Sequence, residues 1–350
     1  MEPEREEAAG AARATAVPSA DRVPVDQALR RAAEVLASAQ RVALAGHVNP
    51  DPDALGSMLG LAAFLRERGV EVVCSWPNDP VEHPAWLSFF RDLPTIVGPR
   101  EFPKAPEVMV ALDTASPDRL ASLLPNAGAA GCLVVLDHHA TNPGFGHVLV
   151  LDPAASSTAE IAYRLMREIG GPVPDQAAAL IYAGIVTDTG RFQYASVTPE
   201  TLRVGAEVRG HPFDHARLAQ LLFEDLPLTA LRLTGLALER LTLVPEASLL
   251  WTHLTQADLA ATGARLVDSD DLIDVVRSAR EADVACVLKE QRDGRLKVSL
   301  RSRGATDVGA IAAARGGGGH RLAAGYTSKR SLADTVADLV EAVPGAREPR

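Results

Sequence analysis

Residues 41–69 read RVALAGHVNPDPDALGSMLGLAAFLRERG and combine two structural signals with a cluster of ionisable groups. The first five residues form an apolar run that predicts a buried strand, and the last twelve form an amphipathic run that predicts a helix. Between them, His47, Asp51 and Asp53 lie within seven residues, together with two prolines. Carboxylates this close repel each other, so an opposite charge must compensate them.

The alternation of apolar runs with helical patterns continues from about residue 26 to residue 200. The apolar runs are nearly continuous, which is typical of strands that are buried on both faces of a parallel sheet. The runs expected to form strands are RVALAGH, VEVVCSW, VMVALD, CLVVLDHH and HVLVLDP. We therefore predict an α/β domain with a parallel sheet and helices on both faces.

The pattern changes after residue 240. The runs ASLLWTHL, DVACVLKEQ and RLKVSLRSR predict strands, and Asp293-Gly294 predicts a hairpin between the last two. ATDVGAIAAAR predicts a helix with Thr306 as its N-cap. These elements predict a second, smaller α/β domain. The expected boundaries are a disordered tail over 1–24, a first domain over 25–200, a helical linker over 201–235 and a second domain over 236–345.

Composition and charge limit the classes of function. The chain has 45 acidic and 35 basic residues and a net charge of −10, which argues against binding to long duplex nucleic acids. A small anion in a locally positive pocket remains compatible with this charge. No apolar run approaches the ~20 residues of a membrane span, and the N-terminus lacks the apolar segment of a secretory signal. The three cysteines have no CxxC spacing and predict reduced thiols in a cytoplasmic protein.

Ionisable residues also follow other predicted strands. VMVAL ends at Asp113, CLVVL ends at Asp137-His138-His139, and Asp188 follows a further apolar run. Because ligand sites in open α/β sheets lie beyond the carboxyl ends of the strands, we expect these groups to meet the first cluster. A single aspartate at a strand end is usually an N-cap or turn residue, and a single buried histidine is usually a core residue. The combination of all four segments in order favours a site.

Two divalent cations would neutralise four converging aspartates. The donors are carboxylate oxygens and imidazole nitrogens without a thiolate, which favours Mn²⁺ and also accommodates Mg²⁺, Co²⁺ or Zn²⁺. A metal pair ~3.5–4 Å apart stabilises the attacking and leaving oxygens of a phosphoryl displacement. The cluster therefore predicts a two-metal phosphoesterase.

The segments HVNPDPDALGS, VALDT, LVVLDHH and GIVTDTGRF resemble the four ordered motifs of the DHH phosphoesterase superfamily. GGGGHRLAAG, with VSLRSR upstream, resembles the signature of the DHHA1 substrate-binding domain. The resemblance covers about residues 30–340 and implies a DHH domain and a DHHA1 domain with the active site in the cleft. The residue between Asp51 and Asp53 is commonly glycine in this superfamily and is Pro52 here, which fixes φ near −65°.

The resemblance also implies a role for each matching residue. One metal would be held by His47, Asp51 and Asp113. The second metal would be held by Asp53, Asp113, His138 and Asp188. His139 would face the scissile phosphate, and Asp137 would orient a neighbouring histidine. The implied substrate-binding residues of the second domain are Arg301, Arg303, Gly317, Gly318, Gly319 and His320.

Simpler explanations exist for the features of the second domain. A glycine run after a helix is often a C-cap and a loop, and Arg301 and Arg303 share a strand face that could be exposed to solvent. Ser157 and Glu160 have the spacing of a capping box, which predicts the start of a helix.

The resemblance implies hydrolysis of very short RNA oligonucleotides and of linear dinucleotides such as pApA to mononucleotides, and removal of the 3′-phosphate of pAp. The alternatives are a single-strand DNA exonuclease of the RecJ type and a non-catalytic nucleotide sensor on the same fold. The first would need an added nucleic-acid-binding domain, and the intact set of ligands disfavours the second. We expect no membrane partner and no long duplex partner, and a homodimer is left open.

Overall fold

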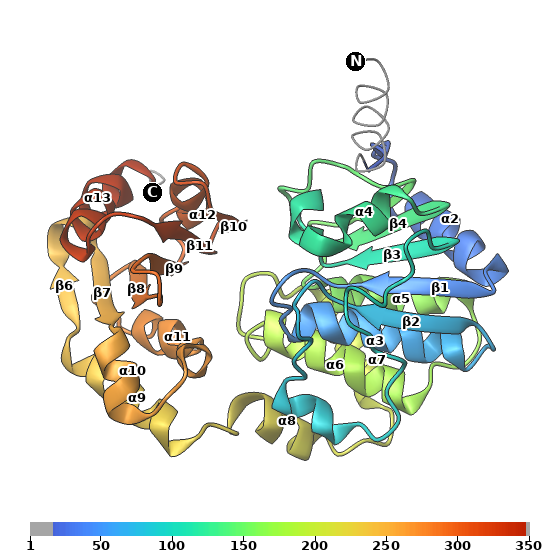
Figure 1. The fold of residues 1–350 in the computed structure, drawn as a ribbon, viewed down its shortest axis with the longest axis horizontal. Coiled ribbons are helices and arrows are strands. Elements are labelled where there is room, and N and C mark those ends of the chain that lie inside the picture. Colours follow the sequence, from blue (N-terminus) through green and yellow to red (C-terminus); the bar gives the residue numbers. More distant parts are fainter. Residues whose placement is uncertain (1–16, 348–350) are drawn as a thin grey trace, which may run out of the picture. The chain divides into compact units, whose positions relative to one another are not determined.

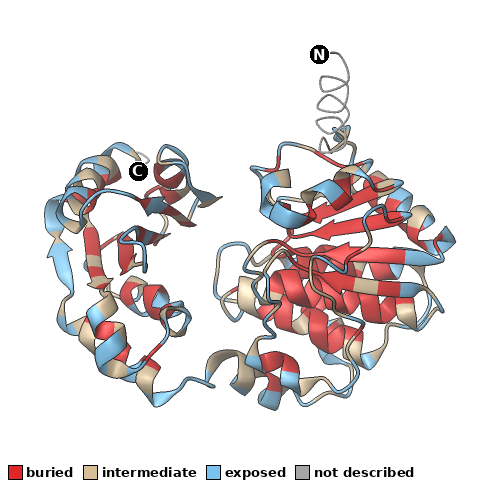
Figure 2. Cartoon of the chain, in the orientation of Figure 1, coloured by how far each residue is buried: buried red, intermediate tan, exposed pale blue. Residues whose placement is uncertain are grey.

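The structure, a computed structural model, describes residues 17–347. The chain divides into two compact units, the first ending at Glu224 and the second beginning at Asp225 (Figure 1). In each unit the buried residues lie mainly on the strands and on the helix faces that cover them (Figure 2). Within residues 17–347, no helix is long and apolar enough to cross a membrane.

The first unit is built on a five-stranded sheet with the strand order β2-β1-β3-β4-β5. The strands are β1 (Arg41–Ala45), β2 (Glu71–Ser75), β3 (Val108–Leu112), β4 (Cys132–Asp137) and β5 (Val148–Leu151). Every neighbouring pair is parallel, which confirms the predicted parallel sheet. The carboxyl ends of the strands therefore share one edge.

Helices cover both faces of this sheet, as predicted. Val42 and Leu44 of β1 pack into the core on one face, whereas Ala43 and Ala45 pack into the core on the other. The larger layer contains α2 (Val25–Ser38), α3 (Pro52–Arg66), α5 (Thr158–Ile169), α6 (Asp175–Asp188), α7 (Pro199–Arg209) and α8 (His215–Phe223). The smaller layer contains the 3₁₀ helix η2 (Pro117–Leu123) and α4 (Leu124–Gly128). A further 3₁₀ helix, η1 (Ala85–Phe89), packs against α8.

The second unit contains a six-stranded mixed sheet with the order β10-β11-β9-β8-β7-β6. The strands are β6 (Thr242–Val244), β7 (Leu249–Leu254), β8 (Val284–Glu290), β9 (Leu296–Ser302), β10 (Gly318–His320) and β11 (Ala323–Ser328). Only β7 and β8 pair in parallel; all other neighbouring pairs are antiparallel. The helices are α9 (Leu228–Glu239), α10 (Gln256–Thr262), α11 (Leu272–Arg277), α12 (Val308–Ala313) and α13 (Leu332–Gly345). Two 3₁₀ helices, η3 (Pro245–Ala247) and η4 (Leu266–Ser269), complete the unit.

The structure places two boundaries differently from the sequence prediction. The predicted tail covers residues 1–24, of which 1–16 lie outside the described residues. Residues 18–20 are ordered, because Ser19 forms a β-bridge with Phe145 and Gly146 N donates to Pro18 O. The predicted linker over 201–235 is not a separate element. Its first two helices pack into the core of the first unit, and α9 packs into the second.

Two local predictions in the second unit have opposite outcomes. The Asp293-Gly294 hairpin is confirmed, since β8 and β9 are antiparallel neighbours and Gly294 has the positive φ of 79° that such turns favour. The N-cap prediction for Thr306 is wrong. Asp307 caps α12, because its Oδ1 accepts a hydrogen bond of 2.9 Å from Ala310 N.

Candidate metal centre and substrate-binding residues

The ionisable groups predicted from the strand ends meet at the carboxyl edge of the first sheet. Four side chains follow or end the neighbouring strands β1, β3 and β4: His47, Asp113, Asp137 and His138. Three overlapping groups have ligand atoms within 4.8 Å of one another, namely His47 with Asp51 and Asp113, Asp53 with Asp113 and His138, and Asp113 with Asp137 and His139. Asp113 belongs to all three groups.

The two carboxylate oxygens of Asp113 face different imidazoles. Oδ2 lies 3.4 Å from His47 Nε2, and Oδ1 lies 3.6 Å from His138 Nε2. The side chain is buried, and the backbone has a φ of 56°, which is uncommon for a residue with a Cβ. Such backbone conformations cluster at functional sites, where the surrounding structure maintains them.

The two histidines are oriented by backbone carbonyls. His47 Nδ1 lies 2.9 Å from Val48 O, and His138 Nδ1 lies 3.4 Å from Ala155 O. A proton on Nδ1 leaves the lone pair of the imidazole on Nε2, the atom that faces Asp113 in both cases. Metal-bound histidines are usually held in this way, so the arrangement fits two divalent cations.

Asp51 combines a structural role with a role in the cluster. Its Oδ1 accepts hydrogen bonds of 3.0 Å from the backbone N–H groups of Asp53 and Ala54 and so caps α3. Its Oδ2 lies 4.0 Å from His47 Nε2. Pro52 occupies the first position of α3, where its fixed φ suits the helix and its missing N–H costs nothing.

Asp53 is held by the N-terminus of α5. Its two oxygens accept hydrogen bonds of 2.7 Å from Thr158 N and 2.9 Å from Ala159 N. Thr158 Oγ1 also donates to Asp113 Oδ1 at 2.9 Å. The helix N-terminus therefore stabilises negative charge next to the cluster. A Cβ at Gly184 of α6 would lie 2.8 Å from Asp53 Oδ1, so glycine keeps this space open.

Further contacts of His138 and His139 belong to the cluster. Asp188, the last residue of α6, has Oδ2 3.5 Å from His138 Nε2. His139 Nδ1 lies 2.8 Å from Asp137 Oδ1, and Asn142 Nδ2 donates to Asp137 Oδ2 at 2.7 Å. Asp137 is fully buried and fixes the ring of His139, the orienting role that the resemblance implies.

The pKa shifts indicate that the protein compensates the charge of Asp113 but not the charges of Asp53 and Asp188. Burial and the charges of Asp113, Asp188 and Asp51 raise the pKa of Asp53 well above its usual range. Burial raises the pKa of Asp188 to about 7, against the opposing charge of His138. The pKa of Asp113 is lowered despite its burial, because His47 donates a hydrogen bond and the charges of His139 and His138 add to it. Bound cations would allow all the carboxylates to ionise together.

The glycine run of the second unit belongs to a tight hairpin formed by β10 and β11. A Cβ at Gly317 would lie 2.2 Å from Gly325 O and 2.5 Å from Tyr326 Cβ, so no larger residue fits there. Gly319 has a φ of 136°. Gly318 has open space at the Cβ position, and His320 ends β10 and is partly buried.

Arg301 and Arg303 have different environments. Arg301 is partly buried, with Nε 3.7 Å from Asp274 Oδ1. Arg303 is exposed, and its Nη1 lies 3.1–3.3 Å from the carbonyls of Arg277, Ser278 and Ala279 at the end of α11. A cation at this end of a helix is favourable. The prediction that Arg303 binds substrate therefore competes with a structural role.

Sequence reasoning missed the residues that hold the ligands in place. Thr158 and Asn142 contact aspartates of the cluster, but neither lies in a motif that points to a metal site. Ser157 was predicted to start a helix and does cap α5. No local signal shows that this helix N-terminus reaches Asp53, which is about a hundred residues earlier in the chain.

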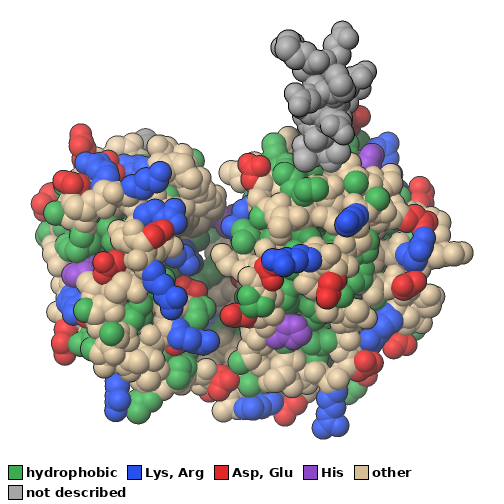
Figure 3. Space-filling model, viewed as in Figure 1, with side chains coloured by type: hydrophobic (Ala, Val, Ile, Leu, Met, Phe, Trp, Pro, Cys, Tyr) green, Lys and Arg blue, Asp and Glu red, His purple; other side chains and the backbone are tan. Residues whose placement is uncertain are grey.

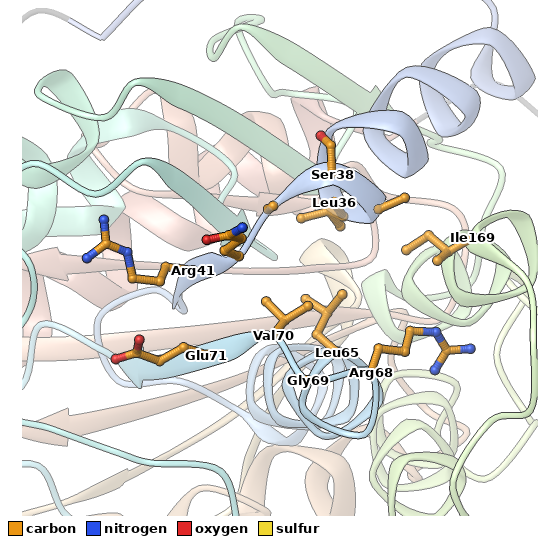
Figure 4. Close-up of a pocket in the computed structure, with 12 residues that line it drawn as sticks. Leu36, Ser38, Arg41, Leu65, Arg68, Gly69, Val70, Glu71 and Ile169 are labelled. Atoms are coloured by element: carbon orange, nitrogen blue, oxygen red, sulfur yellow. The ribbon is translucent and has the colours of Figure 1, made fainter.

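A cavity of about 730 Å³ in the first unit lies at the other edge of the same sheet (Figure 4). Arg41 and Glu71, the first residues of β1 and β2, line it together with Leu65, Arg68 and Ile169. The Arg68 guanidinium donates hydrogen bonds to the carbonyls of Phe64 and Gly170. None of the predicted site residues lines this cavity.

A parallel sheet with carboxylates and imidazoles at its carboxyl edge, followed by a mixed α/β unit, defines a class of two-domain phosphoesterases. Residues 41–185 match the DHH family, N-terminal domain, and residues 260–345 match the DHHA1 domain. The chain belongs to the DHH family of phosphoesterases, in the group that carries a DHHA1 domain.

Two named relatives and one solved structure are similar to this chain over most of its length. The chain is 36% identical over 302 residues to the bifunctional oligoribonuclease and PAP phosphatase NrnA of Thermus thermophilus, covering 86% of this chain and 88% of that protein. It is 32% identical to the protein of the same name from Bacillus subtilis, covering 80% and 86%. An exopolyphosphatase-related protein from Bacteroides fragilis has the same fold, with a TM-score of 0.82, 24% identity and coverage of 91% and 96%.

Proposed function

We propose that this protein is a two-metal phosphoesterase that hydrolyses very short RNA oligonucleotides and linear dinucleotides and removes the 3′-phosphate of pAp. The observation that carries the proposal is the position of Asp113, whose two oxygens face His47 Nε2 and His138 Nε2. A carboxylate in this position suits a bridge between two cations, with His47 and Asp51 on one side and Asp53, His138 and Asp188 on the other.

When bound, the two cations would supply positive charge for the phosphate and would lower the pKa of a water molecule. We propose manganese, because the donors are carboxylates and imidazoles without a thiolate. The protein residues hold this arrangement in place, since the N-terminus of α5 fixes Asp53 and backbone carbonyls fix both histidines.

His139 is proposed to act on the phosphate as a proton donor. In the metal-free protein, burial alone would lower its pKa, but the hydrogen bond to Asp137 and the charge of Asp113 raise the pKa to about 9. Asp137 engages Nδ1, so the ring presents Nε2 toward the substrate in this proposal. A protonated imidazole at this position would stabilise the negative charge that develops on the leaving oxygen.

The substrate class is proposed from the relatives and from the charge of the chain. Relatives at 31–36% identity over most of the chain are named oligoribonucleases and PAP phosphatases. On the face of each unit that Figure 3 shows, basic and acidic side chains are interspersed, which suits small anions better than long strands. Arg301, Gly317–Gly319 and His320 are the residues that we propose to bind the rest of the substrate.

We propose the cytoplasm as the site of action, because Cys74, Cys132 and Cys286 are free thiols. The homodimer that the sequence leaves open stays a prediction.

The test is a Mn²⁺-supplemented assay that compares pApA, pAp, longer RNA, single-stranded DNA and pyrophosphate under one condition. We expect turnover of pApA and pAp and little or none of the other three. Preference for long single-stranded DNA would instead support a RecJ-type exonuclease. Bound Mn²⁺ without turnover of any substrate would support a nucleotide sensor.

A further inference from the structure

Arg119 of η2 places a guanidinium beside the candidate metal centre on a rigid backbone. Its N–H donates to Ser116 O at 3.1 Å, and its carbonyl accepts from Val48 N at 3.0 Å. The next residue, Leu120, is fully buried in the core on the smaller-layer side of the sheet. The side chain of Arg119 itself is exposed. The structure thus fixes where the side chain begins and leaves its charged end accessible to solvent.

The guanidinium and a backbone carbonyl compete for one atom of His47. Arg119 Nη2 and Val48 O both lie 2.9 Å from His47 Nδ1. An imidazole nitrogen carries either a proton or a lone pair, while a guanidinium only donates and a carbonyl only accepts. His47 Nδ1 can therefore satisfy Arg119 or Val48, but not both at the same time.

Metal binding would decide this competition. A cation on His47 Nε2 uses the lone pair there, which places the proton on Nδ1 and gives the hydrogen bond to Val48 O. Arg119 then loses its acceptor. Within residues 17–347, Arg119 has no ion pair with a carboxylate that could take over this role.

We propose that Arg119 is a phosphate-binding residue of the catalytic site, and that it exchanges His47 for the scissile phosphate of the substrate when the metals are bound. The proposal rests on the proposed function, since it assumes a phosphate ester at the metal centre. The planar guanidinium matches two phosphate oxygens at once, which a water molecule or a lysine would not reproduce. Both proposed substrate types, the diester and the 3′-monoester, carry the oxygens it requires.

The decisive experiment uses the full-length protein and two arginine variants. Arg119→Ala removes the proposed contact. Arg31→Ala is the control, because Arg31 is an exposed residue of α2 outside the candidate site. Isothermal titration calorimetry would measure the Kd for Mn²⁺, and then the Kd for inorganic phosphate on the Mn²⁺-loaded proteins.

The two dissociation constants should respond differently in Arg119→Ala. The Kd for Mn²⁺ should stay equal or fall, because a positive charge and a competitor for His47 are removed. The Kd for phosphate should rise at least about tenfold, as expected when a charge-assisted bidentate contact is lost. Arg119→Lys should recover part of the phosphate affinity because it keeps the charge. Arg31→Ala should match the wild type in both measurements.

Three results would overturn the role of Arg119. They are weaker Mn²⁺ binding in Arg119→Ala, phosphate binding equal to the wild type, and a Mn²⁺-loaded wild type that binds no phosphate. The proposed function fails separately, if the wild type binds Mn²⁺ and phosphate but hydrolyses neither pAp nor pApA. In that case the calorimetric comparison still decides whether Arg119 binds phosphate.

Discussion

Buried carboxylates have different partners in the two units. In the second unit, Asp258 is mostly buried, and it pairs with Arg240 through two short hydrogen bonds of 2.5 and 2.7 Å. The hydrogen bond from Arg240 holds the pKa of Asp258 below its usual range. In the first unit, Asp53 and Asp188 lie among other carboxylates and their pKa values are raised. A buried carboxylate without its own cation is costly, so the difference favours a cation-binding site in the first unit.

The candidate site residues of the two units also differ in the contacts that hold them. Those of the first unit face one another and are fixed by backbone groups whose role is to orient them. Those of the second unit have structural explanations as well, such as the contacts of Arg303 with the end of α11 and the close packing at Gly317. Buried charges that converge without compensation, as in the first unit, are therefore a stronger sign of function than the residues of the second unit. The following experiments test this difference between the two units.

Replacement of Asp113, the carboxylate at the centre of the cluster, should have the largest effect on turnover. In Asp113→Ala we expect turnover of pAp and pApA to fall together by at least about 10³-fold, because both metals lose a ligand. Asp113 also accepts hydrogen bonds from His47 and Thr158, so the metal-free variant should lose some thermal stability, and the rates are measured below its melting temperature. Initial rates and melting curves check both points. Wild-type turnover in Asp113→Ala would exclude the bridging role.

The stability of the metal-free protein should depend on pH with an unusual sign. The pKa of Asp188 rises from 3.8 to about 7 on folding, so between these values the folded state binds more protons and stability falls as pH rises. His139 continues the trend, because its charged form is lost as pH rises from 6.5 to about 9. Melting temperatures in a chelator should drop by several degrees from pH 5.5 to pH 8.5, at about 2–4 °C per kcal/mol.

Added Mn²⁺ should reverse this drop, since the cations compensate the ionised carboxylates. Asp188→Asn is the matched variant and should flatten the profile without metal. A metal-free protein that becomes more stable between pH 5.5 and pH 8.5 would contradict the assignment of uncompensated charge to this edge of the sheet.

Alanine substitutions at the neighbouring residues Gly317 and Gly318 should have different effects on stability. Gly317→Ala should destabilise the second unit by about 1–3 kcal/mol, because the new Cβ would overlap Gly325 O and Tyr326 Cβ. Gly318→Ala has open space and should leave the melting temperature nearly unchanged. If the run binds an anion as proposed, Gly318→Ala should still raise the KM for pAp. Equal stability of the two variants would show that the hairpin is not packed as described.

Much of the fold was predictable because it follows from periodicity. The five apolar runs of the first domain are its five strands, since a strand covered on both faces needs apolar residues at every position. The boundaries were less predictable. The pattern of 199–240 indicates helices, but it does not show that α7 and α8 pack with the first unit while α9 packs with the second.

The site was predictable to the same extent as the strand order. Once β1, β3 and β4 are neighbours, their ends bring His47, Asp113 and His138 together. The orienting groups were not predictable, because Thr158 N, Val48 O and Ala155 O are backbone atoms that any residue supplies. Their positions depend on tertiary packing, so the residue types in the sequence do not predict them.

The smallest effects should separate Arg301, which lies on β9, from Arg303, which lies just beyond the end of β9 and not on a strand face as predicted. Arg301→Ala should raise the KM for pAp about tenfold with little change in kcat or stability, because its contact with Asp274 at 3.7 Å is partly exposed and weak. Arg303→Ala should cost about 1 kcal/mol of stability, because it removes the cation from the end of α11, and should change KM less than twofold. Urea unfolding and steady-state kinetics on both variants measure this. If Arg303→Ala raised KM as much as Arg301→Ala without loss of stability, both arginines would bind substrate, and the contrast between the units would be limited to the metal centre.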